Sequence, residues 1–326
     1  MYYGEILSII VAFTWTLTAL CAEVASKRMG QLQMNLLRMA ASLVILALLL
    51  WAFTGSALPH GMNWRAMTWL LASGAMGYVF GDWCLFTTYE LVGSRFGQLM
   101  MTLAPLFSAL TAWLLLDERL GLQAMAGIVV TMGGIGIVVS PTHSHSRRCR
   151  ESSRLNASES ERPMPPQAKT SGSGATGGVS VLAILFGIGA AAGQGVGIVL
   201  SKVGMSLCEQ TPLLPMAATM VRAVAGLVCF GAIYIAKGDR ARMHAGLHDV
   251  TTMHAAAGAI ILGPVIGVTL SLLAVQLAPA GIASTLMALT PVFILWPSRR
   301  LFGQRISLRE VVGSCIAVAG VAIFFL

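Results

Sequence analysis

The chain has 326 residues, of which 56% are hydrophobic and only 10% are charged, and its mean hydropathy is +0.78. Soluble domains carry roughly 25% charged residues, so this composition excludes a soluble globular protein and indicates a membrane protein. The formal net charge is +8, but most basic residues lie in short loops between apolar runs, which predicts a membrane surface rather than nucleic acid as the partner.

Ten apolar segments follow one another along the chain, and each approaches the roughly 20 residues that cross a bilayer of about 30 Å. The segments lack the alternation of barrel strands, and unpaired backbone is too costly in lipid, so each is predicted to be a helix. Glu5 and the absence of a basic leading region predict that the first segment is retained rather than cleaved. The fold class expected is therefore an all-α integral membrane protein with ten transmembrane helices. These cover residues 4–24, 32–53, 66–91, 95–116, 122–140, 180–201, 212–236, 253–276, 279–298 and 307–326.

The two halves of the chain repeat each other at one constant offset, which places Pro105 on Pro291 and Gly127 on Gly313. A single register without gaps over about 60 residues indicates two copies of one unit. Five spans per copy is an odd number, so the second copy enters from the opposite side of the membrane and the copies are predicted to be inverted. The expected domains are five-helix repeats at 1–140 and 180–326, joined by a flexible basic linker at 141–179.

No metal or cofactor is expected from the histidines and cysteines. His143 and His145 lie in a basic tract of the linker, where two histidines are more often ordinary polar residues than metal ligands. The six cysteines include no Cys-x-x-Cys pair, so they indicate neither a disulfide framework nor a zinc site.

Three features recur in order in the two halves. A Ser-Lys pair closes the first helix, an arginine lies within the second, and a proline-containing helix is followed thirteen residues later by Glu or Gln. The residues are Ser26-Lys27, Arg38, Pro105 and Glu118 in the first half and Ser201-Lys202, Arg222, Pro291 and Gln304 in the second. With this pattern each half resembles the EamA-type families of the drug/metabolite transporter (DMT) superfamily. Gln304 departs from the glutamate that the family pattern leads us to expect.

The resemblance implies a ten-helix carrier without a bound cofactor, often an exporter of amino acids, metabolites or drugs. The residues allow two further classes, an intramembrane enzyme and an assembly scaffold. An enzyme would need a reactive constellation, and the sequence has no His-Glu-x-x-His and no Gly-x-Ser-x-Gly. A scaffold would not need charged residues within its spans. The function expected is secondary transport of a small organic solute by alternating access, with protons as the candidate coupling ion.

Asp82 is the first candidate site residue, because it stands well inside the third span. A charge at that depth costs roughly 2.5–3.5 kcal/mol on insertion scales, so it should face a cavity or a partner. It could contact a substrate amine, act as a proton-coupling carboxylate, or form a structural ion pair with Arg38 or Arg222. Those two arginines could hold a substrate carboxylate or tie helices together.

Further candidates lie on the first and sixth spans. Glu5 and Glu23 are eighteen residues apart and share a helix face with Thr16, so they could line a pathway, although both glutamates also lie where a carboxylate reaches water. Trp15 could form an aromatic wall or pack on a neighbouring helix. Gln194 lies in the middle of its span without an acidic neighbour.

Two prolines and one glutamine complete the set of candidate residues. Pro105 and Pro291 remove a helical amide donor each, which predicts a kink that could serve as a hinge. Gln98, near the start of the fourth span, is expected at the membrane interface.

The loop charges predict an orientation in the plasma (inner) membrane. Loops after the odd-numbered spans hold sixteen Lys and Arg residues, whereas the opposite side holds three. The positive-inside rule then places the linker in the cytoplasm and both termini outside. Members of the family that the chain resembles are usually drawn with both termini inside.

Overall fold

A computed structural model describes residues 2–57, 62–118, 121–139, 181–209, 211, 213–237, 239–294, 297 and 308–323. Within these ranges the regular elements are all helices, as the composition predicts. Residues 1–139 and 181–326 form one structural unit. Gln304 and the expected linker at 141–179 lie outside the described residues.

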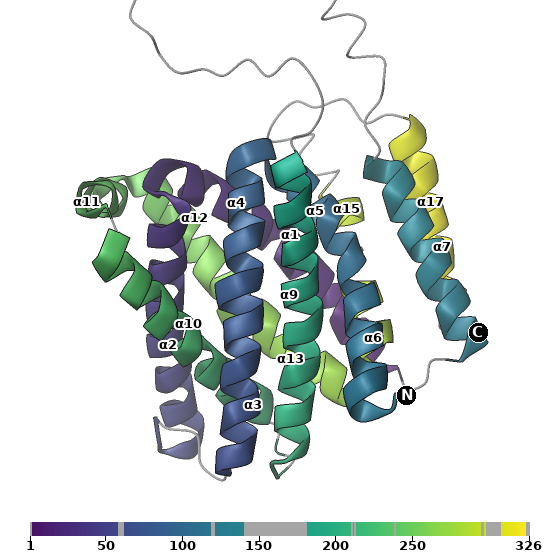
Figure 1. Ribbon diagram of the computed structural model, residues 1–326, viewed down its shortest axis with the longest axis horizontal. Helices are drawn as coiled ribbons and strands as arrows, with labels where there is room; N and C mark the ends of the chain where they lie inside the picture. The colour runs from purple at the N-terminus through teal and green to yellow at the C-terminus, as the bar shows by residue number, and fades with distance from the viewer. Residues whose placement is uncertain are drawn as a thin grey trace, which may run out of the picture. The chain divides into compact units, whose positions relative to one another are not determined.

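The helices of the first half match its five predicted spans in order (Figure 1). The third and fourth are interrupted by a π-helical and a 3₁₀ segment, η1 and η2. The elements are α1 (Tyr3–Met29), α2 (Gln31–Thr54), α3 (Trp64–Gly74), η1 (Ala75–Asp82), α4 (Trp83–Val92), α5 (Ser94–Met100), η2 (Met101–Leu103), α6 (Ala104–Leu116) and α7 (Leu122–Val139).

The second half has the same order of helices, except that it lacks a counterpart of η2 among the described residues and adds α11. Helix α11 is polar, so apolarity alone does not predict it. The Asp239 side chain caps the N-terminus of α11 and accepts a hydrogen bond from Arg242 N. The elements are α9 (Val181–Ser206), α10 (Leu214–Lys237), α11 (Arg240–His248), α12 (Val250–Ile260), η3 (Ile261–Val268), α13 (Thr269–Leu277), α14 (Ala280–Met287), α15 (Thr290–Phe293) and α17 (Leu308–Ile323).

Helix starts and π segments recur at the offset that relates the two sequences. Asn63 caps α3 and Asp249 caps α12, and these two caps are equivalent positions of the repeat. The bounds of η1 and η3 are equivalent positions as well. Asp249 accepts hydrogen bonds from Thr252 and pairs with Arg28 at 2.7 Å. The Thr252 hydroxyl and the Arg28 guanidinium together lower the pKa of the Asp249 carboxyl to about 2.

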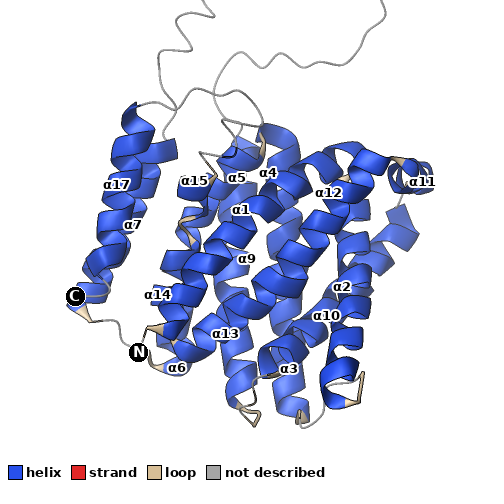
Figure 2. Ribbon diagram, turned by 180° about the vertical axis from the view of Figure 1, so that it is seen from behind, coloured by secondary structure: helices blue, strands red, loops and turns tan. Residues whose placement is uncertain are grey.

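Each half contributes its first helix to the packing of the other half. Helix α9 packs against α3, η1, α4 and α6, whereas α1 packs against α12, η3, α13 and α14. The second helices α2 and α10 pack on each other, as do α7 and α17, which lie side by side in both ribbon views (Figures 1 and 2). The halves are therefore interleaved, and the centre of the unit is built from both.

Glycines allow the closest of these approaches. A Cβ atom on Gly193 of α9 would lie 2.7 Å from the Cα of Gly81 and 2.8 Å from the carbonyl oxygen of Met76. On Gly195 it would lie 2.5 Å from the carbonyl oxygen of Ala104. Small residues let helix backbones approach in this way in membranes, so α9 lies directly against η1 and α6.

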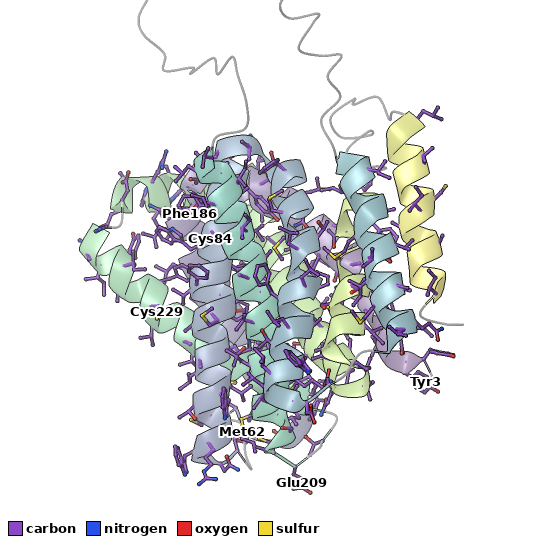
Figure 3. All side chains as sticks on the ribbon, turned by 45° about the vertical axis from the view of Figure 1, so that its right-hand side comes forward. Tyr3, Met62, Cys84, Phe186, Glu209 and Cys229 are labelled. Atoms are coloured by element: carbon purple, nitrogen blue, oxygen red, sulfur yellow. The ribbon has the colours of Figure 1, made fainter. Side chains whose placement is uncertain are left out.

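The outer helix faces are strongly apolar. Trp51, Phe53, Trp113 and Ile235 are between 52% and 83% exposed, and Figure 3 shows Tyr3 projecting away from the helices. Exposed apolar surface on this scale would promote aggregation in water but suits contact with lipid chains.

Among the described residues, six helices are long and apolar enough to cross a membrane, judged by length and composition alone. The chain is thus a multi-pass membrane protein that is helical throughout the regular elements of its described part. The count of ten spans remains a prediction. The six are Tyr3–Met29, Gln31–Thr54, Phe96–Leu116, Val181–Ser206, Leu214–Lys237 and Val250–Leu277.

Candidate functional site

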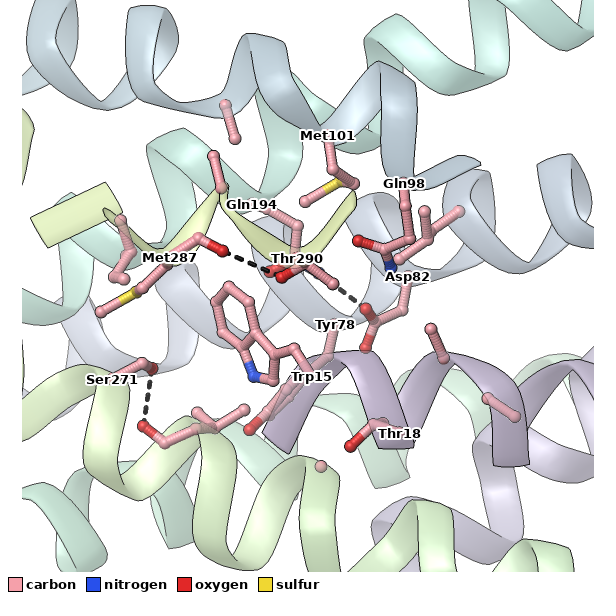
Figure 4. Close-up of a pocket in the computed structure, with 18 of the residues that line it drawn as sticks. Trp15, Thr18, Tyr78, Asp82, Gln98, Met101, Gln194, Ser271, Met287 and Thr290 are labelled. Carbon is pink, nitrogen blue, oxygen red and sulfur yellow. Dashed lines mark hydrogen bonds between the residues drawn. The ribbon is translucent and has the colours of Figure 1, made fainter. Parts of the chain in front are cut away.

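A cavity of about 110 Å³ lies among helices of both halves (Figure 4). Trp15 and Thr18 of α1 line it together with Gln194 of α9 and Met287 of α14. Most of the remaining lining is apolar or aromatic, and three lining residues are charged. These are Arg38, Asp82 and Arg222, the same three intramembrane charges that the sequence singles out.

Asp82 is 4% exposed and both of its carboxylate oxygens accept hydrogen bonds. Gln194 Nε2 donates to Oδ1 at 2.6 Å, and Arg38 donates to Oδ2. The Arg38 guanidinium also donates to Asn35 Oδ1 at 3.1 Å and lies over the Phe86 ring, 4.9 Å from its centroid. The contact with Arg38 is one of the pairings that the sequence leaves open for Asp82.

The π segment and the glycines around it position Asp82. Asp82 is the last residue of η1, and π segments insert an extra residue into a helical turn, which re-aims the side chains that follow. Gln194 Nε2 also donates to the carbonyl oxygen of Gly77 at 3.2 Å, within the same segment. The close approach of Gly193 to Gly81 brings α9 near enough for the Gln194 side chain to reach both acceptors.

Arg222 of α10 is the second arginine of the cavity and is 3% exposed. Its guanidinium carbon lies 4.8 Å from the centroid of the Tyr78 ring. Among the described residues, Arg222 Nε and the Tyr78 hydroxyl have no hydrogen-bond partner, and no carboxylate there forms an ion pair with Arg222. A Cβ atom on Gly77 would lie 2.7 Å from Arg222 Nη2, so the glycine makes room for the guanidinium.

Several lining residues are not anticipated from the sequence. Gln98 was expected at the membrane interface, but it is 7% exposed, lines the cavity and donates to the Tyr89 hydroxyl at 2.5 Å. Its position along the span does not reveal this, because the packing of α5 decides where the side chain points. Tyr78 and Phe86 could have been found, since they are four residues before and after Asp82 and so share its helix face.

The structure does not bring the polar stripe of α1 to the cavity. Thr16 is buried and donates to the carbonyl oxygens of Ala12, at 2.9 Å, and Thr290, at 3.3 Å. Glu23 pairs with Lys27 at 2.5 Å and accepts hydrogen bonds from Ser94. Neither these two nor Glu5 is among the cavity-lining residues, whereas Trp15, on the same helix, is.

Both candidate hinge prolines lie in the first turn of a helix rather than in its interior. Pro105 is the second residue of α6, after η2, and Pro291 is the second residue of α15. Proline is tolerated in a first turn because that amide has no helical acceptor. The Met101 carbonyl oxygen accepts from Ala104 N, and the Met287 carbonyl oxygen accepts from the Thr290 hydroxyl at 2.9 Å (Figure 4). Each helix is therefore interrupted next to the cavity, with its carbonyls locally satisfied.

Glu118, the family-motif residue, joins three segments away from the cavity. Its Oε1 lies 2.5 Å from Lys202 Nζ, and its Oε2 accepts from Ala280 N at 2.9 Å. Lys202 also donates to the Ala278 carbonyl oxygen at 2.9 Å. The loop after α6, the end of α9 and the start of α14 are thus held by one ion pair and two hydrogen bonds.

Replacing Glu118 with glutamine, the residue found at position 304, is expected to lower the free energy of unfolding by about 1 kcal/mol. The variant loses the ion pair with Lys202, whose side chain is 18% exposed, but it keeps an acceptor for Ala280 N. Glu118→Ala should cost about 2 kcal/mol, because that amide then loses its acceptor. Thermal unfolding in detergent micelles measures both. Glu209→Gln, at an exposed glutamate, is the control, and an equal shift in it would contradict the prediction.

A bundle of apolar helices whose interleaved halves line a cavity with buried charges has the architecture of a polytopic membrane carrier. The chain belongs to the EamA-like transporter family, whose model matches residues 2–140 and 181–326. This match confirms the resemblance to the EamA-type families of the DMT superfamily and covers both halves of the chain.

Comparisons with individual proteins support the fold alone. No curated protein matches the chain, whereas 27 chains of solved structures do. One of them, titled only "Crystal structure of protein", shares 13% sequence identity with a TM-score of 0.68. The alignment covers 99% of this chain and 95% of that one.

Proposed function

We propose that this chain is a secondary transporter that exports a small organic solute by alternating access. The observation that carries the proposal is the buried cavity between helices of both repeats, which contains Arg38, Asp82 and Arg222. Charges at that depth are costly in a membrane protein and mark substrate or ion pathways. The family match agrees, since it describes transporters.

The proposal includes ten membrane-spanning helices arranged as two inverted five-helix repeats. The interleaved packing supports it, because α1 lies among helices of the second half and α9 among helices of the first. Such an exchange is expected for two copies related by a two-fold axis in the membrane plane, with the solute site at their interface. The linker at 141–179 then joins two repeats that face opposite sides.

Interruptions in two helices support a rocking motion around the cavity. Helix α5 gives way to α6 through η2, and α14 gives way to α15 at Ala288 and Leu289. Met101, Met287 and Ala288 line the cavity at these points. A bend at either break would move the cavity walls with little change elsewhere. This hinge role is the one proposed for the breaks next to Pro105 and Pro291.

Asp82 is the proposed coupling group, because it is the carboxylate among the described residues that line the cavity. Protonation of Asp82 would release Arg38 and so link proton binding to the charge of the cavity. The proposed location is the plasma membrane. The linker is proposed to lie in the cytoplasm, because that side carries sixteen of the loop Lys and Arg residues.

The competing class is a non-transporting membrane protein, either a scaffold or an intramembrane enzyme. Arg222 argues against a scaffold, because a buried guanidinium without a carboxylate partner among the described residues destabilises a protein that has no ligand for it. No observation favours the enzyme.

Alternating access is tested by cysteine accessibility in proteoliposomes. The native cysteines are replaced and Ser284, a cavity-lining residue that is 7% exposed, is changed to cysteine. Saturable solute counterflow is expected with amino acids, amine drugs, organic acids or purines as the panel, and the solute should shift maleimide labelling of position 284 from one membrane side to the other. Ser56→Cys, two residues after the end of α2 and away from the cavity lining, is the control and should label from one side throughout. Labelling of position 284 from a single side under all conditions, without counterflow, contradicts the proposal.

A further inference from the structure

Arg222 is a buried cation that lacks a protein anion among the described residues. Arg38 is paired with Asp82, whereas the ion pairs of the described chain do not include Arg222. Its Nε has no hydrogen-bond partner although the side chain is 3% exposed and lines the cavity. A buried charge left without a partner is strongly destabilising, so this position favours binding of an anion.

The charge balance of the cavity specifies one negative charge. Its charged lining residues are Arg38, Asp82 and Arg222, which sum to one excess positive charge. Asp82 is already paired with Arg38 and accepts a hydrogen bond from Gln194, so its negative charge is compensated before a solute ammonium group could bind it. A dianion would exceed the single uncompensated guanidinium. A monoanion leaves the cavity neutral.

The groups beside Arg222 can form a binding site for an oxyanion. The guanidinium carbon of Arg222 lies over the Tyr78 ring, 4.8 Å from its centroid, in a cation–π contact. Tyr78 lines the cavity, and its buried hydroxyl has no hydrogen-bond partner among the described residues, so it is a second donor next to Arg222. A carboxylate has two oxygens in one plane and accepts from a guanidinium in a fork geometry.

The rest of the cavity suits an apolar solute body. Trp15, Met101 and Met287 line this cavity together (Figure 4). Aromatic and methionine side chains of this kind bind flat or irregular apolar groups. The polar group and the apolar body would thus meet different walls of one cavity.

We infer that the solute is an organic monoanion with an apolar body, whose carboxylate binds Arg222 and the Tyr78 hydroxyl. This inference rests on the proposed transport function, because the bound solute is the one that is carried. It assigns different roles to the two arginines: Arg38 holds Asp82, and Arg222 receives the solute.

The test uses five probes of similar size that differ in charge: 3-phenylpropionate, 3-phenylpropanamide, phenethylamine, phenylalanine and phenyl phosphate. Their affinities for purified protein in detergent are measured by calorimetry, with thermal stabilisation as the second readout. Wild-type protein should bind 3-phenylpropionate, and the neutral amide, the cationic amine, the zwitterion and the dianion should each bind at least 10-fold more weakly. Equal or tighter binding of the amine or amide, or no binding of 3-phenylpropionate, would overturn the inference.

Variants assign the effect to one residue. Arg222→Gln should weaken 3-phenylpropionate binding roughly 10- to 100-fold, the range expected for a hydrogen bond to a charged group. Arg222→Lys should weaken this binding less, because it keeps the positive charge. Arg65→Gln is the matched control, since Arg65 also lies over an aromatic ring, that of Trp64 at 5.7 Å, but is exposed. Unchanged affinity in Arg222→Gln would overturn the assignment. The probe series on wild-type protein decides the charge preference even where Arg222→Gln does not fold.

Different results would contradict the transport proposal and the anion inference. Counterflow of a cationic or neutral solute in proteoliposomes would leave transport intact and overturn the anion inference. Binding of 3-phenylpropionate through Arg222, without exchange of this or any panel solute, would support the binding site and contradict transport.

Discussion

Replacing Asp82 with asparagine is expected to lower the free energy of unfolding by about 3–5 kcal/mol, the usual cost of removing one partner from a buried ion pair. The variant leaves Arg38 and Arg222 buried without a carboxylate at the cavity, since Asp82 supplies the one that lines it. Proton-coupled transport should be lost. Thermal unfolding in detergent and solute counterflow measure the two effects. A stable variant that transports with unchanged pH dependence would remove Asp82 from the mechanism.

A second substitution distinguishes charge imbalance from loss of a particular contact. Arg38→Gln combined with Asp82→Asn returns the cavity to one excess positive charge, as in the wild type. The double variant should therefore be more stable than Asp82→Asn alone, and the coupling energy of the cycle should be at least about 1 kcal/mol. Strictly additive effects would show that the Arg38–Asp82 ion pair contributes little.

Replacing Gly193 with alanine is expected to destabilise the protein by about 3 kcal/mol, the upper end of the usual range for overpacking. The added Cβ would lie 2.7 Å from Gly81 Cα and 2.8 Å from the Met76 carbonyl oxygen. These are backbone atoms that cannot rotate away, so α9 must move from η1. The hydrogen bond from Gln194 to Asp82 should lengthen as a result. Thermal unfolding and ligand binding to the purified variant measure both consequences.

Gly231→Ala is the matched control for this substitution. Gly231 also lies within a helix, α10, but a Cβ atom there would meet nothing within 4 Å. Alanine should then raise stability by roughly 0.5–1 kcal/mol through its helix propensity. Similar losses at both glycines would contradict the packing argument.

Composition and internal repetition determine the class and much of the helix plan. Hydropathy is a sum over residues, so a membrane protein is evident before any contact is known. The constant offset between the halves also predicts equivalent structure, and the π segments η1 and η3 recur at that offset. Polar α11 carries no apolar signal and is missed, because its start depends on the local cap at Asp239.

The sequence also identifies the three intramembrane charges of the cavity, because burying a charge in hydrocarbon requires a partner or a function. Only the tertiary structure decides the pairing. Asp82 contacts Arg38 and Gln194 because α2 and α9 both pack beside the third span, at α4 and η1, and these contacts join residues 44 and 112 positions apart. Arg222 is left facing the cavity for the same reason. The sequence pattern determines which buried charges need a partner. Helix packing determines which groups become those partners, because glycines allow the helix backbones to approach closely.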